Sequence, residues 1–449
     1  MRKTLLALGC VAALVFTGCT GESSLPVATG EGTLRAINAI PDSPVILFVI
    51  EERSIGTVEY SNLSNQVSFD DLEYTFNFEV LLLGDLLQTR VASTVLKVER
   101  DTEYTFLISG VLATPTITVW ETAIREWEGT ETVFQARFAH TAESLGPIDV
   151  YFAAPGVAPV LGQQAGTMSF TEFLPPFEYE AGEYVVTFTT AGDPNDILFL
   201  TDSITPVAQA GFTMAIFDGT ANNPGPVAVR LITDAGTVSN VPDLNVLPTV
   251  RFFHASTDLA TADIYIDEML TDQILADHAF RDVTGDIDLA FGAYPFTYTA
   301  AGNVGAILFE GTATVFPGRH NQIYVVTDTE GELESFLRIP DRRPVSTLVR
   351  FSYVHAAANH PLVDVYIVAA GTDIADALPQ FRSLSPGSPT ATTNLRDGDF
   401  EIYLTVATEK TVITGPVPLT TVLGDVVDYI SYDNVGDPTL ADLVLIPLP

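Results

Sequence analysis

Three histidine–aspartate pairs are the residues of this chain whose types and spacing could do chemistry. In each pair the aspartate follows the histidine by nine residues: His140 and Asp149, His254 and Asp263, His355 and Asp364. An imidazole held by a carboxylate is the base half of a hydrolytic triad, and both groups also bind metal ions. The spacing therefore raises two possibilities, a hydrolase and a metal site.

Both chemical patterns are incomplete in the sequence. No Gly-x-Ser-x-Gly turn, which would present a nucleophilic serine, occurs anywhere. No third metal ligand recurs at a fixed distance from the pairs, and acidic turns such as Asp397-Gly398-Asp399 lack the full spacing of a Ca²⁺ loop. We therefore predict no catalytic residue, no metal site and no cofactor, and a hydrolase with a motif His as base is the least favoured alternative.

Each pair belongs to a longer phrase that begins with an arginine, as in Arg137-Phe138-Ala139-His140. Side chains alternate faces along a strand, so Phe138 and His140 share one face while Arg137 and Ala139 share the other. The His thus ends a row that faces the core, where its ring needs a hydrogen-bond partner. We predict a structural pair, in which the His bonds either the Asp or the backbone of the eight-residue loop between them.

Other positions around the phrase follow from the same alternation. In the strand after the loop, the tyrosines are expected to face outward, where they would be exposed: Tyr151, Tyr265 and Tyr366. His278, His320 and His360 share no spacing, and we expect them at the surface.

A weaker fourth copy begins at Arg35, with Asn38 in the His place and Leu47 in the Asp place. The four lead arginines are 102, 114 and 99 residues apart, which predicts four similar domains in tandem, the first of them degenerate.

Short alternating runs bounded by Gly, Pro, Asp and Asn dominate each copy and predict an all-β fold. Roughly seven strands in about 100 residues are typical of a two-sheet sandwich of immunoglobulin type. The predicted tandem β-sandwich domains, with the segments before them, have these bounds: 1–19 lipoprotein signal peptide, 20–32 flexible tether, 33–127 first sandwich, 131–239 second, 248–340 third and 346–449 fourth.

The phrase resembles the opening motif of domain-of-unknown-function family 4397, of the type Arg-x-x-His-Ala-x-x-Asp-Ala-Pro-x-Val-Asp-Val-Tyr. The matching residues in the third copy are Arg251, His254, Ala255, Asp263, Ile264 and Tyr265. The later Ala181-Gly182-Glu183-Tyr184 is similar to the second motif of the family. The resemblance covers nearly all of the chain after residue 32. It implies exported bacterial β-sandwich domains without an assigned activity.

The N-terminus predicts export. Arg2 and Lys3 precede a short apolar run that ends in Phe16-Thr17-Gly18-Cys19. This ending resembles the bacterial lipobox, which implies lipidation at Cys19 and a lipid anchor in the membrane. An ordinary secretory signal with an incidental cysteine is the alternative. Thr20, not Asp, follows Cys19, which favours the outer membrane in a Gram-negative host.

Composition excludes several classes of function. The formal net charge is −37, which repels nucleic acid and anionic membrane surfaces. It fits either recruitment of cations or basic partners, or a surface adapted to salty water. With two cysteines in total, neither a disulfide framework nor a Cys-based metal site can form.

These observations predict a non-catalytic, lipid-anchored protein of the cell envelope, periplasmic or surface-facing. Four sandwiches in a row would act as a surface spacer or as an interaction module for an envelope or extracellular polymer or protein. The alternative is a glycan- or Ca²⁺-binding array that uses end loops and the exposed tyrosines.

Overall fold

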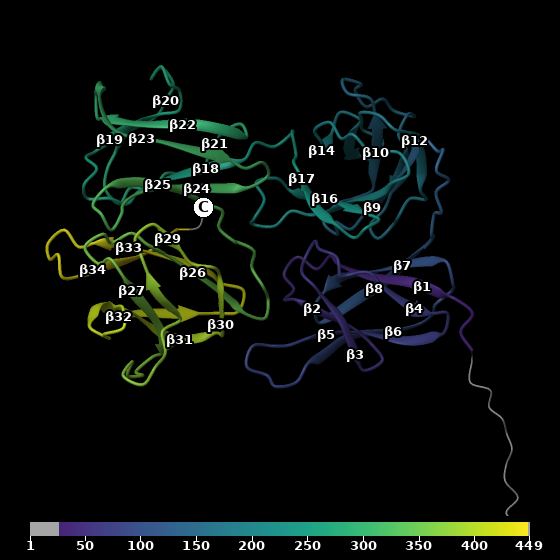
Figure 1. Cartoon of the computed structure of the whole chain (residues 1–449), viewed down its shortest axis with the longest axis horizontal. Helices are drawn as coiled ribbons and strands as arrows, with labels where there is room; N and C mark the ends of the chain where they lie inside the picture. Colours follow the sequence, from purple (N-terminus) through teal and green to yellow (C-terminus); the bar gives the residue numbers. More distant parts are fainter. Residues whose placement is uncertain (1–26, 448–449) are drawn as a thin grey trace, which may run out of the picture.

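The computed structural model describes residues 27–447, and all its regular elements are β-strands (Figure 1). These strands form eight sheets, which pair into successive two-sheet sandwiches. The predicted all-β class with tandem β-sandwich domains is therefore confirmed. Cys19, the leader and residues 20–26 of the tether lie outside the described residues. Within residues 27–447 no helix has the length and apolar character needed to cross a membrane.

The strands are numbered along the chain. The first sandwich comprises β1 (Glu31–Asn38), β2 (Ile46–Ile50), β3 (Arg53–Val58), β4 (Val67–Asp70), β5 (Glu73–Val80), β6 (Thr89–Lys97), β7 (Thr102–Val111) and β8 (Thr114–Ala123). The second comprises β9 (Val133–His140), β10 (Ile148–Ala153), β11 (Gly166–Met168), β12 (Phe177–Glu180), β13 (Val185–Thr190), β14 (Ile197–Leu200), β15 (Gly211–Asp218), β16 (Val227–Thr233) and β17 (Val238–Val241). The third comprises β18 (Thr249–His254), β19 (Ala262–Tyr265), β20 (Gln273–His278), β21 (Ile287–Asp288), β22 (Gly292–Ala300), β23 (Asn303–Val315), β24 (His320–Thr327) and β25 (Leu333–Arg338). The fourth comprises β26 (Val349–His355), β27 (Val363–Ala369), β28 (Phe381–Leu384), β29 (Ser388–Pro389), β30 (Thr393–Leu395), β31 (Gly398–Val406), β32 (Val412–Thr421), β33 (Val426–Asp433) and β34 (Ala441–Leu445).

One strand order recurs in all four sandwiches. We name the sheet that holds the phrase strand the inner sheet and the other sheet the outer sheet. The inner sheets are β4-β1-β7-β8, β12-β9-β15-β16-β17, β21-β18-β24-β25 and β29-β26-β33-β34, with β30 also on β26. The outer sheets are β3-β2-β5-β6, β11-β10-β13-β14, β20-β19-β22-β23 and β28-β27-β31-β32. In every inner sheet the phrase strand runs parallel to its long central neighbour, as β1 does to β7.

This connectivity differs in detail from the expectation. The second strand of each sandwich leaves the sheet of the first, whereas in immunoglobulin constant domains the first two strands share a sheet. Each sandwich also has more than seven strands, because short edge strands join each sheet. β1 begins at Glu31, inside the predicted tether, and β17 ends at Val241, two residues past the predicted end of the second sandwich.

Every sandwich has its own apolar core between its inner and outer sheets. In the second, Phe138 of the phrase packs with Ile148, Val150 and Phe188, all fully buried. The other cores are built in the same way, around Phe106, Phe252 and Phe351. The predicted parity of the phrase strand is therefore correct on the core side.

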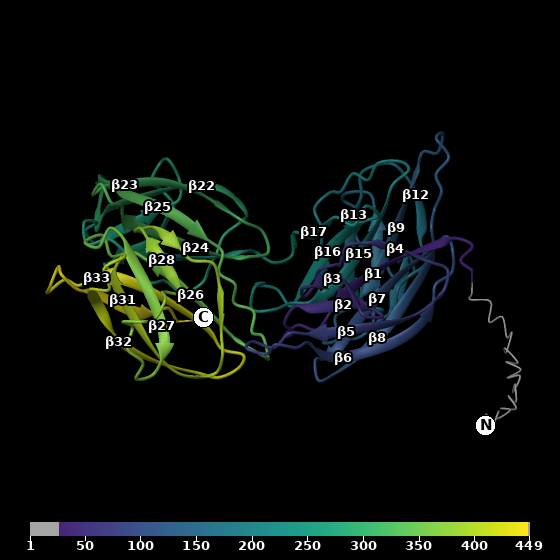
Figure 2. The same ribbon diagram turned by 60° about the horizontal axis from the view of Figure 1, so that its bottom comes forward.

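The opposite face of each inner sheet is also buried, because the sandwiches pack in pairs through these faces. Ile37, Leu107 and Trp120 of the first sandwich meet Ala139 and Phe217 of the second. Between the third and fourth sandwiches the contact residues include Phe253, Tyr324, Val354, Ile430 and Tyr432. A row of four sandwiches was expected, and that expectation is wrong: the two pairs lie side by side as two lobes (Figures 1 and 2).

One turn of each sandwich, which we name the docking turn, connects the third and fourth strands and helps to form this contact. It holds one residue at positive φ: Ser61 (54°), Thr171 (69°), Arg281 (72°) or Gly387 (78°). The amide of that residue donates to the carbonyl of the motif position: to Asn38, His140 and His254 at 2.8 Å, and to His355 at 2.9 Å. The repeated phrase therefore fixes the docking turn.

Each docking turn reaches a late inner-sheet strand of the partner sandwich. Arg230 of β16 donates to the carbonyl and hydroxyl of Ser61, and Trp120 Nε1 of β8 donates to the Thr171 carbonyl at 2.9 Å. Arg281 forms an ion pair with Asp442 of β34. Gly387 lies so near Glu334 of β25 that an added Cβ would meet its carboxylate. Both pairs thus use the same reciprocal contact, like the isologous interface of a two-fold dimer.

Candidate functional site

The three motif histidines all bond to the backbone of the loop that follows them. His140 Nε2 lies 3.0 Å from the Gly146 carbonyl, and His254 Nε2 lies 3.3 Å from the Ala260 carbonyl. His355 Nε2 lies 2.8 Å from the carbonyl of His360. Each ring is fully buried at the end of its core-facing row. The His therefore closes the loop through its backbone, which is one of the two alternatives drawn from the sequence.

The first copy does the same with an amide. Asn38 is fully buried, its Nδ2 donates to Ser43 Oγ at 2.7 Å, and its Oδ1 accepts from the Ile40 amide at 3.0 Å. Asn can take the place of His because the task is to satisfy loop groups, which needs hydrogen bonds and no titratable group.

Burial decides the protonation of these rings. It lowers the pKa of His140 and of His254, and it lowers the pKa of His355 to about 4. All three are therefore neutral at neutral pH. The Nδ1 atoms of His140 and His254 are buried without a hydrogen-bond partner among the described residues, and that of His355 lies 2.9 Å from Ser431 Oγ. A solvated substrate cannot reach any of these nitrogens, which removes the basis for a general-base role.

The three motif aspartates have partners of their own. One oxygen of each accepts an amide from the turn after the central strand of the outer sheet: Gly192 at 2.8 Å, Gly302 at 2.8 Å and Thr408 at 3.0 Å. The other oxygen accepts a hydrogen bond from the third strand of the same sandwich, at Thr167, Asp277 and Ser383. The structure thus gives His and Asp separate tasks, one in the first loop and one in the outer sheet.

With this geometry described, comparison with known proteins identifies the phrase. The model of the family described as Domain of unknown function (DUF4397) matches residues 248–366. Residues 248–366 are thus similar to the DUF4397 family. The match covers the third sandwich and continues through β26 into β27, so it includes the phrases of the third and fourth copies. That all four sandwiches are DUF4397 copies stays a prediction from the repeated phrase.

Two further comparisons add little to the DUF4397 match. Among the solved structures, the chain is similar to "The Bacillus anthracis TIE protein", with 10% identity and a TM-score of 0.15. That similarity covers 90% of this chain and 69% of the other, and at this TM-score it carries no argument. No curated protein matches the chain.

The three tyrosines of the repeated phrase, which were expected to be exposed, are buried. Tyr151, Tyr265 and Tyr366 are 4%, 8% and 2% exposed. They do point away from the sandwich core, as the alternation predicts, but neighbouring segments cover the rings. Tyr366, for example, packs against Ile374 and Ala377 of the next loop. The expectation of exposed tyrosines is wrong, and the glycan-binding alternative loses the aromatic surface on which it rested.

The remaining histidines were also misplaced. His278 and His360 are buried and His320 is half-buried. Burial, followed by the neighbouring His254, lowers the pKa of His278 to about 4. Across residues 27–447 no group of three or more His, Cys, Asp or Glu is placed to hold a metal ion.

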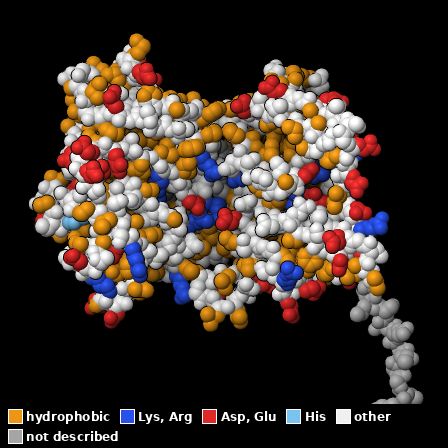
Figure 3. Space-filling view, in the orientation of Figure 1, with side chains coloured by type: hydrophobic (Ala, Val, Ile, Leu, Met, Phe, Trp, Pro, Cys, Tyr) orange, Lys and Arg blue, Asp and Glu red, His pale blue; other side chains and the backbone are white. Residues whose placement is uncertain are grey.

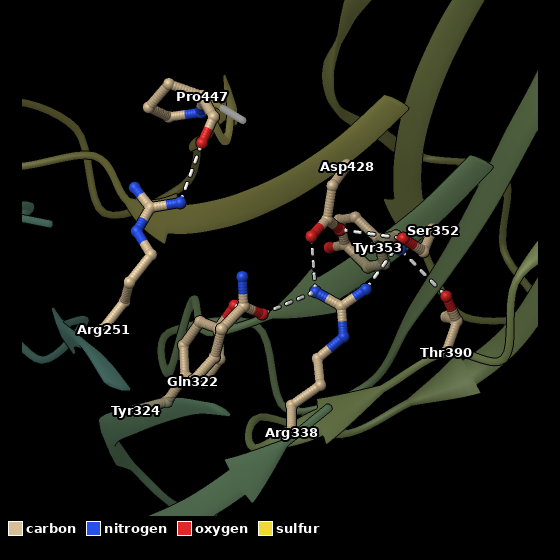
Figure 4. Close-up of polar contacts among 9 residues, drawn as sticks. All are labelled: Arg251, Gln322, Tyr324, Arg338, Ser352, Tyr353, Thr390, Asp428 and Pro447. Atoms are coloured by element: carbon tan, nitrogen blue, oxygen red, sulfur yellow. Dashed lines mark hydrogen bonds and ion pairs between the residues drawn. The ribbon is translucent and has the colours of Figure 1, made fainter. Parts of the chain in front are cut away.

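The lead arginines of the phrase lie in the contacts between sandwiches, a role that the sequence analysis did not assign. Arg35 pairs with Glu103 of the first sandwich, and Arg137 Nη1 lies 3.3 Å from Asp234 of the second. The two ion pairs lie near each other across the contact, where the charges of Arg137 and Asp234 act on Arg35. Between the third and fourth sandwiches, Arg251 donates to the Pro447 carbonyl at 2.8 Å (Figure 4). The signal for these contacts was present, because the outward positions beside the arginines, such as Ala139 and Phe253, are apolar.

A buried ion pair crosses the contact between the third and fourth sandwiches. Arg338 of β25 donates to Asp428 of β33 at 2.6 Å and to Ser352 of β26 at 2.7 Å (Figure 4). Both side chains of the ion pair are less than 10% exposed. Burial opposes the charge of Arg338, but Asp428 outweighs that effect and raises the arginine pKa. The Arg338–Asp428 ion pair therefore stays charged although both side chains are almost fully buried from solvent.

All four sandwiches meet around two adjoining cavities, at the centre of the face where basic side chains gather (Figure 3). The smaller cavity, of about 140 Å³, is lined by Arg230, Arg319, Arg343 and Arg350 together with Glu59 and Asp341. The larger, of about 330 Å³, lies between the second and third sandwiches and shares Asn223, Arg230 and Arg319 with it. Six of the residues that line the smaller cavity are charged, and four of these are arginines.

Proposed function

We propose that this chain is a non-catalytic lipoprotein of the cell envelope, whose four sandwiches form one compact interaction module. The observation that carries the proposal is the use of the repeated polar residues. Every motif His or Asn and every motif Asp bonds backbone or side chains of its own sandwich. The recurring polar residues therefore hold loops and turns in place by hydrogen bonds. No reactive group recurs with them among the described residues.

The paired arrangement favours an interaction module over a spacer. A spacer is long because its domains are joined end to end. Here, in contrast, the inner sheets are buried against each other in face-to-face contacts. The surfaces left free are the outer sheets and the loops at both ends of each sandwich. Loops on a rigid scaffold are the usual place for recognition, so an envelope or extracellular polymer or protein is the proposed partner.

The proposed location rests on the leader. A short apolar run before a lipobox-like Phe16-Thr17-Gly18-Cys19 supports acylation at Cys19, and Thr20 supports delivery to the outer membrane. The acidic chain would then be held near the membrane by its lipid, because its charge gives no attraction to anionic headgroups.

Radiolabelled palmitate followed by membrane fractionation tests this proposal. We expect label in the protein and recovery of the protein with outer membranes. Cys19→Ser should abolish the label and release the chain to the soluble fraction. Cys10→Ser is the matched control, because it removes the other cysteine of the leader, and it should change neither result. Unlabelled wild-type protein, or a Cys19→Ser variant that stays in the membrane, would refute the anchor.

A further inference from the structure

The junction of the four sandwiches concentrates positive charge in a chain that is otherwise strongly acidic. Arg230, Arg319, Arg343 and Arg350 line the smaller cavity, against the carboxylates of Glu59 and Asp341. The lining therefore carries a net charge of +2, whereas the whole chain carries −37. Only 20 residues of the chain are basic, so four arginines around one cavity are a marked departure from the average surface.

Among the described residues, three of the four arginines have no carboxylate partner, and Arg230 and Arg319 also have few or no other partners. Arg230 donates to the carbonyl and hydroxyl of Ser61, at 3.1 and 2.7 Å. The guanidinium of Arg319 forms no hydrogen bond or ion pair with any residue in the described part of the chain. Arg350 is paired with Asp341, and Arg343 donates to the carbonyls of Pro41 and Ser43 at 2.9 Å. The guanidinium groups of Arg230 and Arg319 therefore have N–H donors that form no hydrogen bond with the described residues and could bind a ligand.

The uncompensated charge has a physical cost at this site. Burial, followed by repulsion from Arg319, lowers the pKa of Arg230 to about 10. Burial also lowers the pKa of Arg319, Arg343 and Arg350. A chain with 57 acidic residues could have neutralised the junction with two more carboxylates. An anion that binds there would remove the same cost, since buried charges are stable when they are paired.

The cavity dimensions specify the ligand further. A water molecule occupies about 30 Å³ in the liquid, so the smaller cavity of about 140 Å³ has room for a phosphate-sized group. The adjoining cavity of about 330 Å³ is walled in part by Val229, Val241, Phe316 and Ile339. Asp243 also lines it. Its Oδ1 accepts from the amides of Leu200 and Asn245, and its Oδ2 is buried without a partner among the described residues.

We propose that the junction is a binding site for a small organic phosphate. The dianionic head would lie against Arg230 and Arg319 in the smaller cavity, and an apolar body would fill the larger one. Guanidinium groups suit this head because their planar donors can bind two phosphate oxygens at once. Because the lining residues come from all four sandwiches, binding would also fasten the two pairs to each other.

Calorimetric titration and thermal melting of the full mature chain test the site with three probes: phenyl phosphate, inorganic phosphate and phenol. We expect phenyl phosphate to bind at least tenfold more tightly than inorganic phosphate, and phenol not to bind. Ligand that binds the native state raises the melting midpoint, so the midpoint should rise with phenyl phosphate. Inorganic phosphate that binds equally well would refute the apolar half of the site. Absence of binding by both phosphates would overturn the proposal.

Arg230→Gln and Arg319→Gln should each weaken phenyl phosphate binding at least tenfold. Arg53→Gln is the matched control, because Arg53 is exposed on β3 and its loss changes the net charge equally. Arg319→Gln should also melt no lower than wild type without ligand, because it removes a half-buried charge that has no partner among the described residues. Equal weakening in the control would show a general charge effect and no built site. A lower unliganded midpoint for Arg319→Gln would show that this arginine is structural.

Discussion

The two face-to-face contacts share their geometry and differ in their chemistry. In both, a docking turn held by the motif His or Asn reaches the partner's inner sheet. In the first pair of sandwiches, Trp120 stacks on Phe173 across the contact at 5.0 Å. The Arg137–Asp234 ion pair lies within the second sandwich, on the side that faces Arg35 of the first, and its carboxylate is 37% exposed. Between the third and fourth, the charged pair Arg338–Asp428 is almost fully buried.

This difference shows which part of the contact the repeat preserves. The backbone of the docking turn and its anchor recur in every sandwich. The turn residue at positive φ changes from Ser to Thr to Arg to Gly, and the residue that it meets changes from Arg to Trp to Asp to Glu. Titratable groups differ as well, since five of the six histidines lie in the third and fourth sandwiches. The two pairs should therefore respond differently to the same kind of substitution and to acid.

The largest difference is expected for the charged pairs. Arg338→Ala leaves Asp428 buried without its cation and should cost about 4 kcal/mol of unfolding free energy. Arg137→Ala leaves a carboxylate that water can reach, so its cost should be about 1 kcal/mol. Urea unfolding of both variants measures the two losses. Replacement of both partners, Arg338→Met with Asp428→Leu, should recover most of the loss, and equal losses for the two alanine variants would contradict the contrast.

The apolar contact of the first pair is expected to come next. Trp120→Ala removes a ring that is only 7% exposed and should cost about 3 kcal/mol. Trp120→Phe keeps an aromatic ring but loses the bond to the Thr171 carbonyl, and should cost about 1 kcal/mol. Melting curves of the two variants decide this. A Trp120→Ala protein as stable as wild type would mean that the first two sandwiches do not pack through this face.

Acid should weaken the second pair more than the first. The folded pKa of His355 is about 4, below the ordinary value of 6.5, so the unfolded chain binds more protons between these values. His355 therefore supports stability fully above pH 6.5, and that support falls by about 2 kcal/mol between pH 6.5 and pH 5. His355→Asn removes this titration while it keeps a side chain that serves the first copy as Asn38. Unfolding curves at both pH values should show a smaller loss for the variant, and an identical loss would mean that His355 is already charged in the native state.

The smallest effect is expected for the loop closure itself. His254→Ala leaves the Ala260 carbonyl without its partner and should cost about 1.5 kcal/mol in urea unfolding. His254→Asn should lose less, because Asn38 closes the equivalent loop of the first sandwich. An Asn variant as weak as the Ala variant would show that the two anchors are not equivalent.

The core-facing half of this structure could be predicted from the sequence, and the partner-facing half could not. Alternation placed Phe138 and His140 correctly, because residues two apart share a face of a strand. The same rule left Ala139, Phe253 and Tyr151 facing outward, and it does not say whether water or another part of the chain lies there. Continuous apolar runs such as Gln322-Ile323-Tyr324-Val325-Val326 were the available signal, since strands buried on both faces lose their alternation. The junction arginines were not predicted, because they come from separate sandwiches and share no spacing in the sequence.

Small-angle X-ray scattering of the mature chain tests the central claim, that the four sandwiches form two face-to-face pairs in one body. A single compact body of this length has a radius of gyration of about 22 Å, and two adjacent lobes should raise it only slightly. We expect a value below about 28 Å that does not change with salt. A radius above about 35 Å, with the long distance tail of domains in a row, would contradict the account.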